Sequence, residues 1–303
     1  MTSTPTRVTV KARDDIELVG DRLGDPDQPL VIFLHGAGQT RHAWRRSTVR
    51  LAAAGFCTIA LDLRGHGDSS WARDGDYRRQ AFADDLRAVH HQLGRFAAIV
   101  GASLGGLSAL LAHDQHPDGI TESLVLVDIA PRIEAAGADR ILAFMADRPE
   151  GYATVQEVAE AIGRYNPHRP PPRDLEGLRR NLRIGADGRY RWHWDPCLID
   201  SPTSLISARD PEALHAAARR LTIPCLLVRG RNSDLLTEEG AAEFRDAVPH
   251  AAYIDIAGAG HMVAGDSNDP FTSAVVEFVT RDSRPGLPPE RAVSRPTNAG
   301  APR

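Results

Sequence analysis

The sequence predicts an α/β fold in which helices flank a central, mostly parallel sheet. Two observations predict this class. Short runs of apolar residues recur along the chain without the polar–apolar alternation of a half-exposed strand, which is typical of strands buried on both faces. Amphipathic stretches with helical spacing separate these runs, and strands that alternate with helices generally pair in parallel.

The expected strands lie before residue 130 and after residue 224. Two strand-like segments come first, and a Gly-Asp-Pro-Asp turn separates them from the first fully apolar run. Strands are expected at residues 7–12, 16–24, 30–34, 56–63, 97–100, 124–129, 225–228 and 252–256.

The expected helices of this sheet carry an apolar stripe or a clear start signal. Four residues at i, i+4, i+7 and i+11 share one helical face: Phe82, Leu86, Val89 and Leu93. Asp210-Pro211 and Asp269-Pro270 each place a capping carboxylate before a proline at the first helical position.

Residues 132–215 break the alternation. They contain no apolar strand but several amphipathic stretches, and about 85 residues are too many for a loop of a compact domain. Helices are expected at 140–146, at 155–165 and near 175–182, and a hairpin or irregular strand at 189–194. We therefore predict a core of residues 1–131 and 216–282, an inserted helical subdomain at 132–215, and a disordered Pro-, Arg- and Gly-rich tail at 283–303.

The composition excludes several classes of protein. With 36 Lys and Arg against 40 Asp and Glu, the net charge of −4 argues against a nucleic-acid partner. No apolar run approaches the roughly 20 residues that span a bilayer, so no membrane association is expected. Three widely spaced cysteines outside any Cys-x-x-Cys pair indicate a reducing, cytoplasmic location. A small molecule is the expected partner, and the sequence leaves the oligomeric state open.

The segment Gly101-Ala-Ser103-Leu-Gly105 joins an expected strand to an expected helix. This Gly-x-Ser-x-Gly pattern is typical of a nucleophilic serine held in a sharp strand-to-helix turn, where larger residues two positions before or after it would collide with the neighbouring elements. The turn places the hydroxyl at a helix N-terminus, which favours developing negative charge. The pentapeptide alone is weak evidence for a nucleophilic serine, and its position between an expected strand and an expected helix strengthens this evidence.

A serine needs a base beside it. His261 lies in a glycine-rich loop just after the last expected strand, and Asp234 follows the strand at 225–228. In chain order the set is Ser103, Asp234 and His261. All three follow the carboxyl ends of expected parallel strands, where open α/β sheets place their sites. The loop at residues 34–38 is short enough to offer a backbone N–H near Ser103, and with the N–H of Leu104 it would form an oxyanion hole.

Together these motifs resemble the α/β-hydrolase superfamily, and the cap-bearing serine esterase and cofactor-free haloperoxidase branch in particular. The resemblance covers nearly the whole chain apart from the insert and the tail. It rests on His35-Gly-Ala-Gly38, Asp62-Leu-Arg-Gly-His-Gly-Asp-Ser69, Gly101-Ala-Ser-Leu-Gly105, Asn232-Ser-Asp234 and Gly260-His261.

The resemblance implies roles for these residues. Ser103 is the implied nucleophile, His261 the base and Asp234 the orienting acid, with the N–H groups of Ala37 and Leu104 as oxyanion donors. The insert is implied to be a cap over the pocket. Epoxide hydrolases and haloalkane dehalogenases of this superfamily carry Asp at the nucleophile position, so Ser103 excludes both activities. Asp128, after the strand at 124–129, is the alternative acid, since some members place it there.

Other residues near these motifs have structural explanations. The resemblance implies that His35 and His66 shape their loops by backbone hydrogen bonding. The histidine pairs at 90–91 and at 113 and 116 are expected on the surface and not in a metal site, because no third metal ligand is apparent. Trp192, His193 and Trp194 either line a pocket or pack the insert against the core, and the sequence favours neither role. Phe144, Met145 and Tyr165 are further candidate pocket residues, although residues on an amphipathic face more often pack inside such an insert.

The sequence as a whole predicts a serine hydrolase that cleaves a carboxylic ester through an acyl-enzyme, without a metal or organic cofactor. C–C bond hydrolysis and perhydrolase or haloperoxidase chemistry use the same three residues and stay open. A small-molecule binding protein on the same fold is the non-enzymatic alternative.

Overall fold

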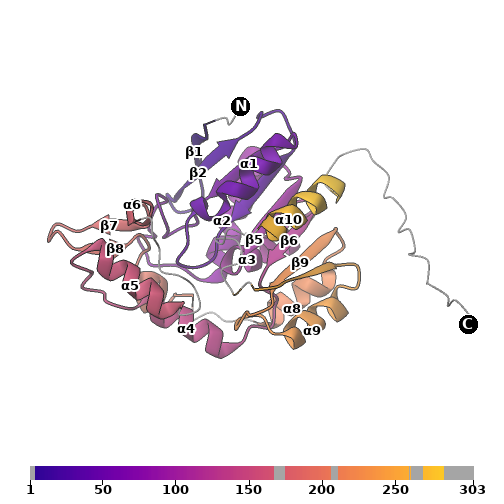
Figure 1. Cartoon of the computed structure of the whole chain (residues 1–303). Helices are drawn as coiled ribbons and strands as arrows, with labels where there is room; N and C mark the ends of the chain where they lie inside the picture. Colours follow the sequence, from indigo (N-terminus) through magenta and orange to yellow (C-terminus); the bar gives the residue numbers. More distant parts are fainter. Residues whose placement is uncertain (1–3, 167–174, 206–210, 259, 261–268, 283–303) are drawn as a thin grey trace, which may run out of the picture.

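A computed structural model describes residues 4–166, 175–205, 211–258, 260 and 269–282 of the chain. Eight strands form one sheet in the order β1-β2-β4-β3-β5-β6-β9-β10 (Figure 1). All eight expected strands are confirmed, as β1 (Thr6–Lys11), β2 (Glu17–Leu23), β3 (Leu30–Leu34), β4 (Cys57–Leu61), β5 (Ala98–Ala102), β6 (Leu124–Val127), β9 (Cys225–Gly230) and β10 (Ala252–Ile256).

The sheet is mostly parallel, as predicted. Only β2 runs against its neighbours β1 and β4, and every other adjacent pair is parallel. In β3, Val31 and Phe33 point to one hydrophobic cluster while Ile32 and Leu34 point to the other. This strand is therefore buried on both faces, which explains why its sequence is apolar throughout.

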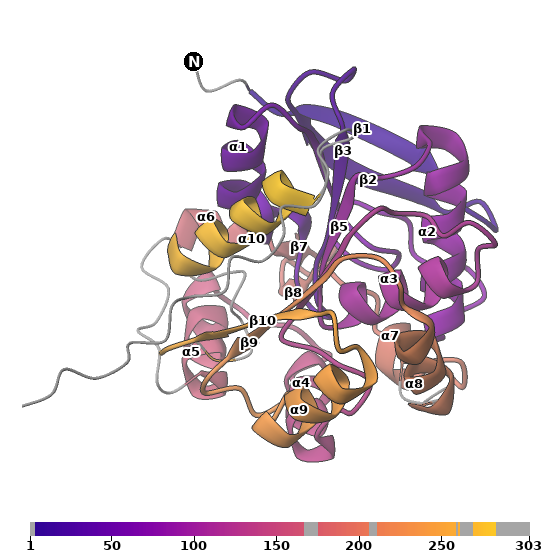
Figure 2. The ribbon, with the colours of Figure 1, turned by 90° about the vertical axis from the view of Figure 1, so that its right-hand side faces the viewer.

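Helices cover both faces of the sheet (Figure 2). The short helix η1 (Arg41–Trp44), α1 (Arg45–Ala53) and α10 (Asp269–Asp282) lie on one face, with Trp44 and Phe271 6.2 Å apart between ring centroids. On the other face lie α2 (Arg79–Leu93), α3 (Leu104–Asp114), α8 (Pro211–Arg220) and α9 (Glu238–Ala247).

The helix signals are confirmed with small differences. Phe82, Leu86 and Val89 are fully buried, whereas Leu93, the last residue of α2, is 39% exposed because the chain leaves the helix at Gly94 with φ 82°. Helix α8 begins at Pro211, as expected, and α10 begins at Asp269 itself, one residue earlier than expected. Asp210 lies outside the described residues.

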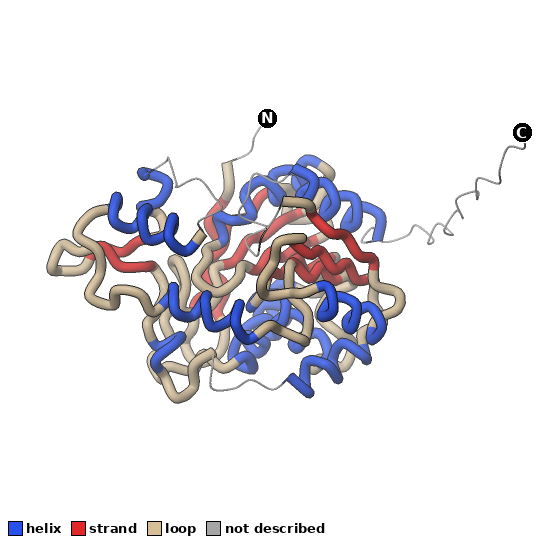
Figure 3. The backbone as a smooth tube through the Cα atoms, turned by 60° about the horizontal axis from the view of Figure 1, so that its bottom comes forward, coloured by secondary structure: helices blue, strands red, loops and turns tan. Residues whose placement is uncertain are grey.

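The inserted segment (residues 132–215) projects beyond one end of the strands (Figures 1 and 3). Its elements are α4 (Ala135–Met145), α5 (Val155–Tyr165), α6 (Leu175–Arg179), the hairpin β7 (Leu182–Ile184)–β8 (Tyr190–Trp192) and α7 (Cys197–Asp200). The expected helices are present, although α4 starts at Ala135. The segment 189–194 contains the strand β8, but its partner β7 was not expected, and Leu182, the expected end of a helix, belongs to that strand. The domain limits stay a prediction, and the predicted tail at 283–303 lies outside the described residues.

Candidate active site

Ser103 stands at the turn between β5 and α3, in strained backbone geometry. Its φ of 45° and ψ of −115° are unusual for a residue with a side chain. The Ser103 N–H donates to the Val127 carbonyl oxygen at 3.2 Å, which ties the turn to the neighbouring strand β6. The predicted strained strand-to-helix turn is thus confirmed.

The glycines of the motif are required by close packing. A Cβ on Gly101 would lie 2.6 Å from Gly106 Cα, and one on Gly105 would lie 2.6 Å from Leu34 Cβ. Real Cβ atoms do not approach other carbons this closely. These glycines therefore let α3 start directly against the sheet, as the pattern predicts.

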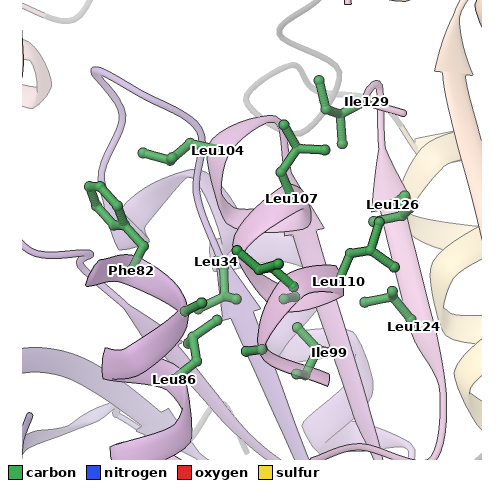
Figure 4. Packing of buried hydrophobic residues seen from close by; sticks show 14 of the residues in the cluster. Leu34, Phe82, Leu86, Ile99, Leu104, Leu107, Leu110, Leu124, Leu126 and Ile129 are labelled. Atoms are coloured by element: carbon green, nitrogen blue, oxygen red, sulfur yellow. The ribbon is translucent and has the colours of Figure 1, made fainter. Parts of the chain in front are cut away.

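Helix α3 also forms part of the floor of the site. Figure 4 shows Leu110 of α3 near Leu34, Ile99 and Leu126 of the sheet, whereas Leu104, Leu107 and Ile129 lie nearer the end at which α3 begins. The deeper residues fill the core, whereas Leu104, Leu107 and Ile129 line a cavity that reaches Ser103. One helix thus presents the serine and an apolar floor beside it.

This first cavity, the aliphatic cavity, has a volume of about 260 Å³. Its lining is apolar apart from Ser103 and Arg79. It consists of Ala37, Arg79, Ser103, Leu104, Leu107, Ile129, Pro131, Ile133, Ala135, Ala138, Ile141, Leu142, Leu205, Pro211, Leu214 and Leu235. Sequence reasoning missed nearly all of them. The apolar spacing of Ile133, Ala138, Ile141 and Leu142 was the available signal, but it is equally typical of a packed helix face.

A second cavity, the aromatic cavity, has a volume of about 320 Å³ and shares Ala37, Ser103 and Ile141 with the first. Five of the candidate pocket residues line it: Phe144, Met145, Tyr165, Trp192 and Trp194. Trp192 and Trp194 are stacked with ring centroids 4.8 Å apart, and Phe144 is stacked on Tyr165 at 4.4 Å. Its polar residues include Gln39, Asn166 and Asn181.

The two expected oxyanion donors lie at the junction of these cavities. Ala37 lines both and Leu104 lines the aliphatic one. Within the described residues neither backbone N–H donates to another protein group. Leu104 is the first residue of α3, where backbone N–H groups lack partners inside the helix. Both amides are therefore available to an oxyanion.

The two candidate acids have different surroundings. Asp128, at the end of β6, is fully buried, and its carboxylate accepts hydrogen bonds from Gly230 N at 2.8 Å and Ser233 Oγ at 2.5 Å. The Asp234 side chain is 35% exposed, and its Oδ2 lies 2.6 Å from a guanidinium nitrogen of Arg140 in α4.

His261, the expected base, lies outside the described residues. The chain leading to it is described up to Gly260, apart from residue 259. The nearest atom to a Cβ on Gly260 would be the Asn232 carbonyl oxygen, at 3.9 Å. Residue 260 thus lies beside the loop that carries Ser233 and Asp234.

Among the described residues, no cluster of three or more His, Cys, Asp or Glu side chains could hold a metal ion. Nor does any helix in the described ranges combine the length and the hydrophobicity that a bilayer crossing requires.

Comparison with known proteins gives consistent relatives. Residues 31–274 match the model of the alpha/beta hydrolase family. The chain is 32% identical over 262 residues to an esterase, Rv0045c, from Mycobacterium tuberculosis, covering 83% of this chain and 81% of the esterase. It is 30% identical over 256 residues to 2-(acetamidomethylene)succinate hydrolase from Mesorhizobium japonicum, covering 83% and 88%.

Two further similar proteins are an enzyme that matches part of the chain and one with a solved structure. A bifunctional esterase/perhydrolase from Acinetobacter calcoaceticus is 30% identical over 123 residues, which cover 40% of this chain and 44% of that enzyme. The crystal structure of E-2-(acetamidomethylene)succinate hydrolase superposes with a TM-score of 0.75 and 26% identity, over 91% of this chain and 99% of that one.

Proposed function

This chain belongs to the α/β-hydrolase family and is a hydrolase, and we propose that it cleaves carboxylic esters with Ser103 as the nucleophile. The observation that supports this most is the position of Ser103. Its strained turn at a helix N-terminus lies at the junction of two cavities and beside two unpaired backbone N–H groups among the described residues.

The proposed reaction proceeds through an acyl-enzyme. Ser103 Oγ attacks the ester carbonyl carbon while His261 takes its proton, and the N–H groups of Ala37 and Leu104 stabilise the oxyanion. The tetrahedral intermediate collapses and the alcohol leaves with the proton from His261. A water molecule, deprotonated by the same histidine, then attacks the acyl-enzyme and releases the carboxylic acid.

The acid that orients His261 is one of two carboxylates. The sequence favours Asp234, and residue 260 lies beside its loop. Arg140 already neutralises Asp234, however, and water reaches its half-exposed carboxylate. The buried Asp128, held by Gly230 N–H and Ser233 O–H, is better placed to stabilise an imidazolium because its charge is screened less. We therefore rank Asp128 first and keep Asp234 as the competing candidate.

The two cavities suggest how an ester is divided between them. We assign the acyl chain to the aliphatic cavity, whose lining is almost entirely hydrocarbon. We assign the leaving alcohol to the aromatic cavity, where Gln39, Asn166 and Asn181 can solvate a hydroxyl. The inserted segment would then act as the cap of the site, since α4 lines both cavities.

The relatives favour ester hydrolysis over C–C bond hydrolysis and peracid formation. Rv0045c, which matches most of the chain, is named an esterase, whereas the esterase/perhydrolase matches less than half of it. The test is the hydrolysis of p-nitrophenyl esters of increasing acyl length. Each methylene buried in the aliphatic cavity contributes about 0.8 kcal/mol, so kcat/KM should rise roughly fourfold per methylene until the cavity is filled.

Ser103→Ala should lower kcat by roughly 10²–10⁶-fold while the protein stays folded. Unchanged turnover in this variant would contradict the proposed mechanism. A folded native protein that binds these esters but hydrolyses none would favour the binding-protein alternative.

A further inference from the structure

Three buried histidines from distant parts of the chain lie in a row that starts at His35, directly after β3. His35 and His66 are fully buried, and His193, directly after β8 of the inserted segment, is 2% exposed. The ring centroids of His35 and His66 are 4.9 Å apart, and those of His66 and His193 are 6.0 Å apart. The row therefore runs from the sheet into the insert.

Each of these rings accepts a hydrogen bond from a backbone N–H. His35 Nε2 accepts from Leu63 at 2.9 Å, His66 Nε2 from Gly38 at 3.1 Å, and His193 Nδ1 from Gly67 at 2.8 Å. A ring nitrogen that accepts carries no proton, so all three histidines are neutral. Burial, which lowers the pKa of each, maintains this state at neutral pH.

These bonds connect the inserted segment to the loop that carries Ala37. His193 Nδ1 accepts a hydrogen bond from the N–H of Gly67, and the N–H of Asp195 donates to the Gly65 carbonyl oxygen at 2.8 Å. Residue 66, between these two contacts, accepts from the N–H of Gly38, next to Ala37. Trp194 packs against the same place, since a Cβ on Gly38 would lie 3.5 Å from its ring.

We infer that His193 and His66 are positioning residues that hold the backbone N–H of Ala37 where the oxyanion forms. This inference rests on the proposed function, in which Ala37 is an oxyanion donor. Neither histidine lines the cavities at Ser103, so their effect on catalysis is indirect. Because the insert contributes His193, it orders the catalytic loop of the core as well as enclosing the substrate.

The expected effect is on the transition state rather than on substrate binding. An oxyanion donor contributes only when its N–H already points at the developing charge, and a small displacement removes most of its contribution. Loss of the His193 contact should therefore lower kcat by about 10–100-fold, less than complete loss of a donor, and leave KM within about twofold.

Amide substitutions test the acceptor atom itself. The Oδ1 of asparagine takes the place of histidine Nδ1, and the Oε1 of glutamine takes the place of Nε2. His193 accepts through Nδ1 and His66 through Nε2. His193→Asn should therefore keep most of kcat, whereas His193→Gln and His193→Leu should lose it. At position 66 the order reverses, with Gln retaining activity and Asn and Leu losing it.

His113 is a matched control. The sequence suggested a surface role, but His113 is half-buried, and its Nδ1 accepts from Ile120 N–H at 3.3 Å. It lies at the end of α3 opposite Ser103. His113→Leu should lower the thermal midpoint without changing kcat.

A second readout is the inhibition constant of an alkyl trifluoromethyl ketone, which adds to the serine as an oxyanion. In His193→Gln this inhibition constant should rise by the same factor by which kcat/KM falls. The inference is overturned if His193→Gln and His193→Asn have equal kcat, or if inhibitor affinity is unchanged in both. Retained turnover in Ser103→Ala would instead overturn the proposed function, so the two failures are distinguishable.

Discussion

Ser103, Asp128 and Asp234 illustrate how the surroundings of a residue decide its chemistry. Ser103 and Asp128 directly follow the strands β5 and β6, and Asp234 lies in the loop after β9. Ser103 and Asp128 adopt positive φ angles of 45° and 51°. Such geometry is costly for residues with a side chain and persists where neighbouring groups hold it in place. The Asp128 N–H donates to Val228 O at 2.6 Å, which supplies part of this restraint.

The choice of acid is testable by isosteric substitution. We expect Asp128→Asn to lower kcat by roughly 10³–10⁴-fold, because an amide cannot stabilise the imidazolium. Asp234→Asn should lower it less than about tenfold, since Arg140 already neutralises that carboxylate. Kinetics on one p-nitrophenyl ester, with circular dichroism to verify folding, make the comparison. The reverse order of effects would identify Asp234 as the acid.

At this scale the sequence identifies the nucleophile turn from its glycine spacing and its place between strand and helix. It does not separate the two acids, because the difference lies in the tertiary partners of each: Arg140 from α4 for Asp234, and Ser233 for Asp128. For His193 the sequence leaves open whether the residue lines a pocket or packs the insert against the core, because its partner Gly67 lies 126 positions away.

At the scale of elements, the approach of α3 to the sheet fixes the position of Ser103. A Cβ on Gly105 would lie 2.7 Å from the Leu34 carbonyl oxygen and 2.8 Å from that of His35, and backbone atoms cannot move aside cheaply. Gly105→Ala should therefore destabilise the fold by about 2–4 kcal/mol, although alanine favours a helix by about 1 kcal/mol.

Gly240 is the control for this substitution. It lies in α9, where the atoms nearest to a Cβ would be the end of the Leu236 side chain at 3.3 Å, the Arg132 carbonyl oxygen at 3.5 Å and Thr237 Oγ1 at 3.6 Å. Gly240→Ala should be neutral or stabilising by up to about 1 kcal/mol. Urea denaturation of both variants measures the difference, and equal stabilities would disprove the packing argument.

The division of the ester between the cavities is tested by a second matched pair. Ala138 lines only the aliphatic cavity and Ala43 only the aromatic one. Ala138→Phe should lower kcat/KM for a hexanoyl ester about tenfold more than for an acetyl ester, because the ring occupies the space of the chain. Ala43→Phe should leave this ratio unchanged, and kcat/KM of this variant should depend instead on the size of the alcohol. The opposite pattern would exchange the two assignments.

The elements themselves were largely predictable, since their periodicity is local. All eight sheet strands, and the strand β8 of the insert, followed from pattern alone. The aliphatic cavity did not, because residues from 37 to 235 line it and only the fold brings them together.

At the scale of the whole molecule, buried neutral histidines make stability depend on pH. Burial lowers the pKa of His35 to about 4 and that of His66 to about 3, against about 6.5 in the unfolded chain. Between these values the unfolded chain binds protons that the folded protein does not. The free energy of unfolding is therefore highest above about pH 6.5 and falls as pH decreases towards 4.

Each of these histidines lowers the free energy of unfolding by at most about 1.4 kcal/mol for each unit that the pH decreases in that range. Asp85, whose pKa burial raises to about 6, opposes part of the fall. Urea denaturation at pH 7, 6 and 5 measures the slope, and His66→Gln should reduce it. Constant stability from pH 7 to 5 would contradict the neutral histidine row.

The measurement that tests the central proposal most directly is labelling with a fluorophosphonate, which reacts with an activated serine. Mass spectrometry of the digested native protein should find the adduct on the peptide that contains Ser103 and on no other. Ser103→Ala should lose both the adduct and ester hydrolysis. An unlabelled Ser103 in native protein that hydrolyses esters, or hydrolysis that survives in folded Ser103→Ala, would contradict the proposal.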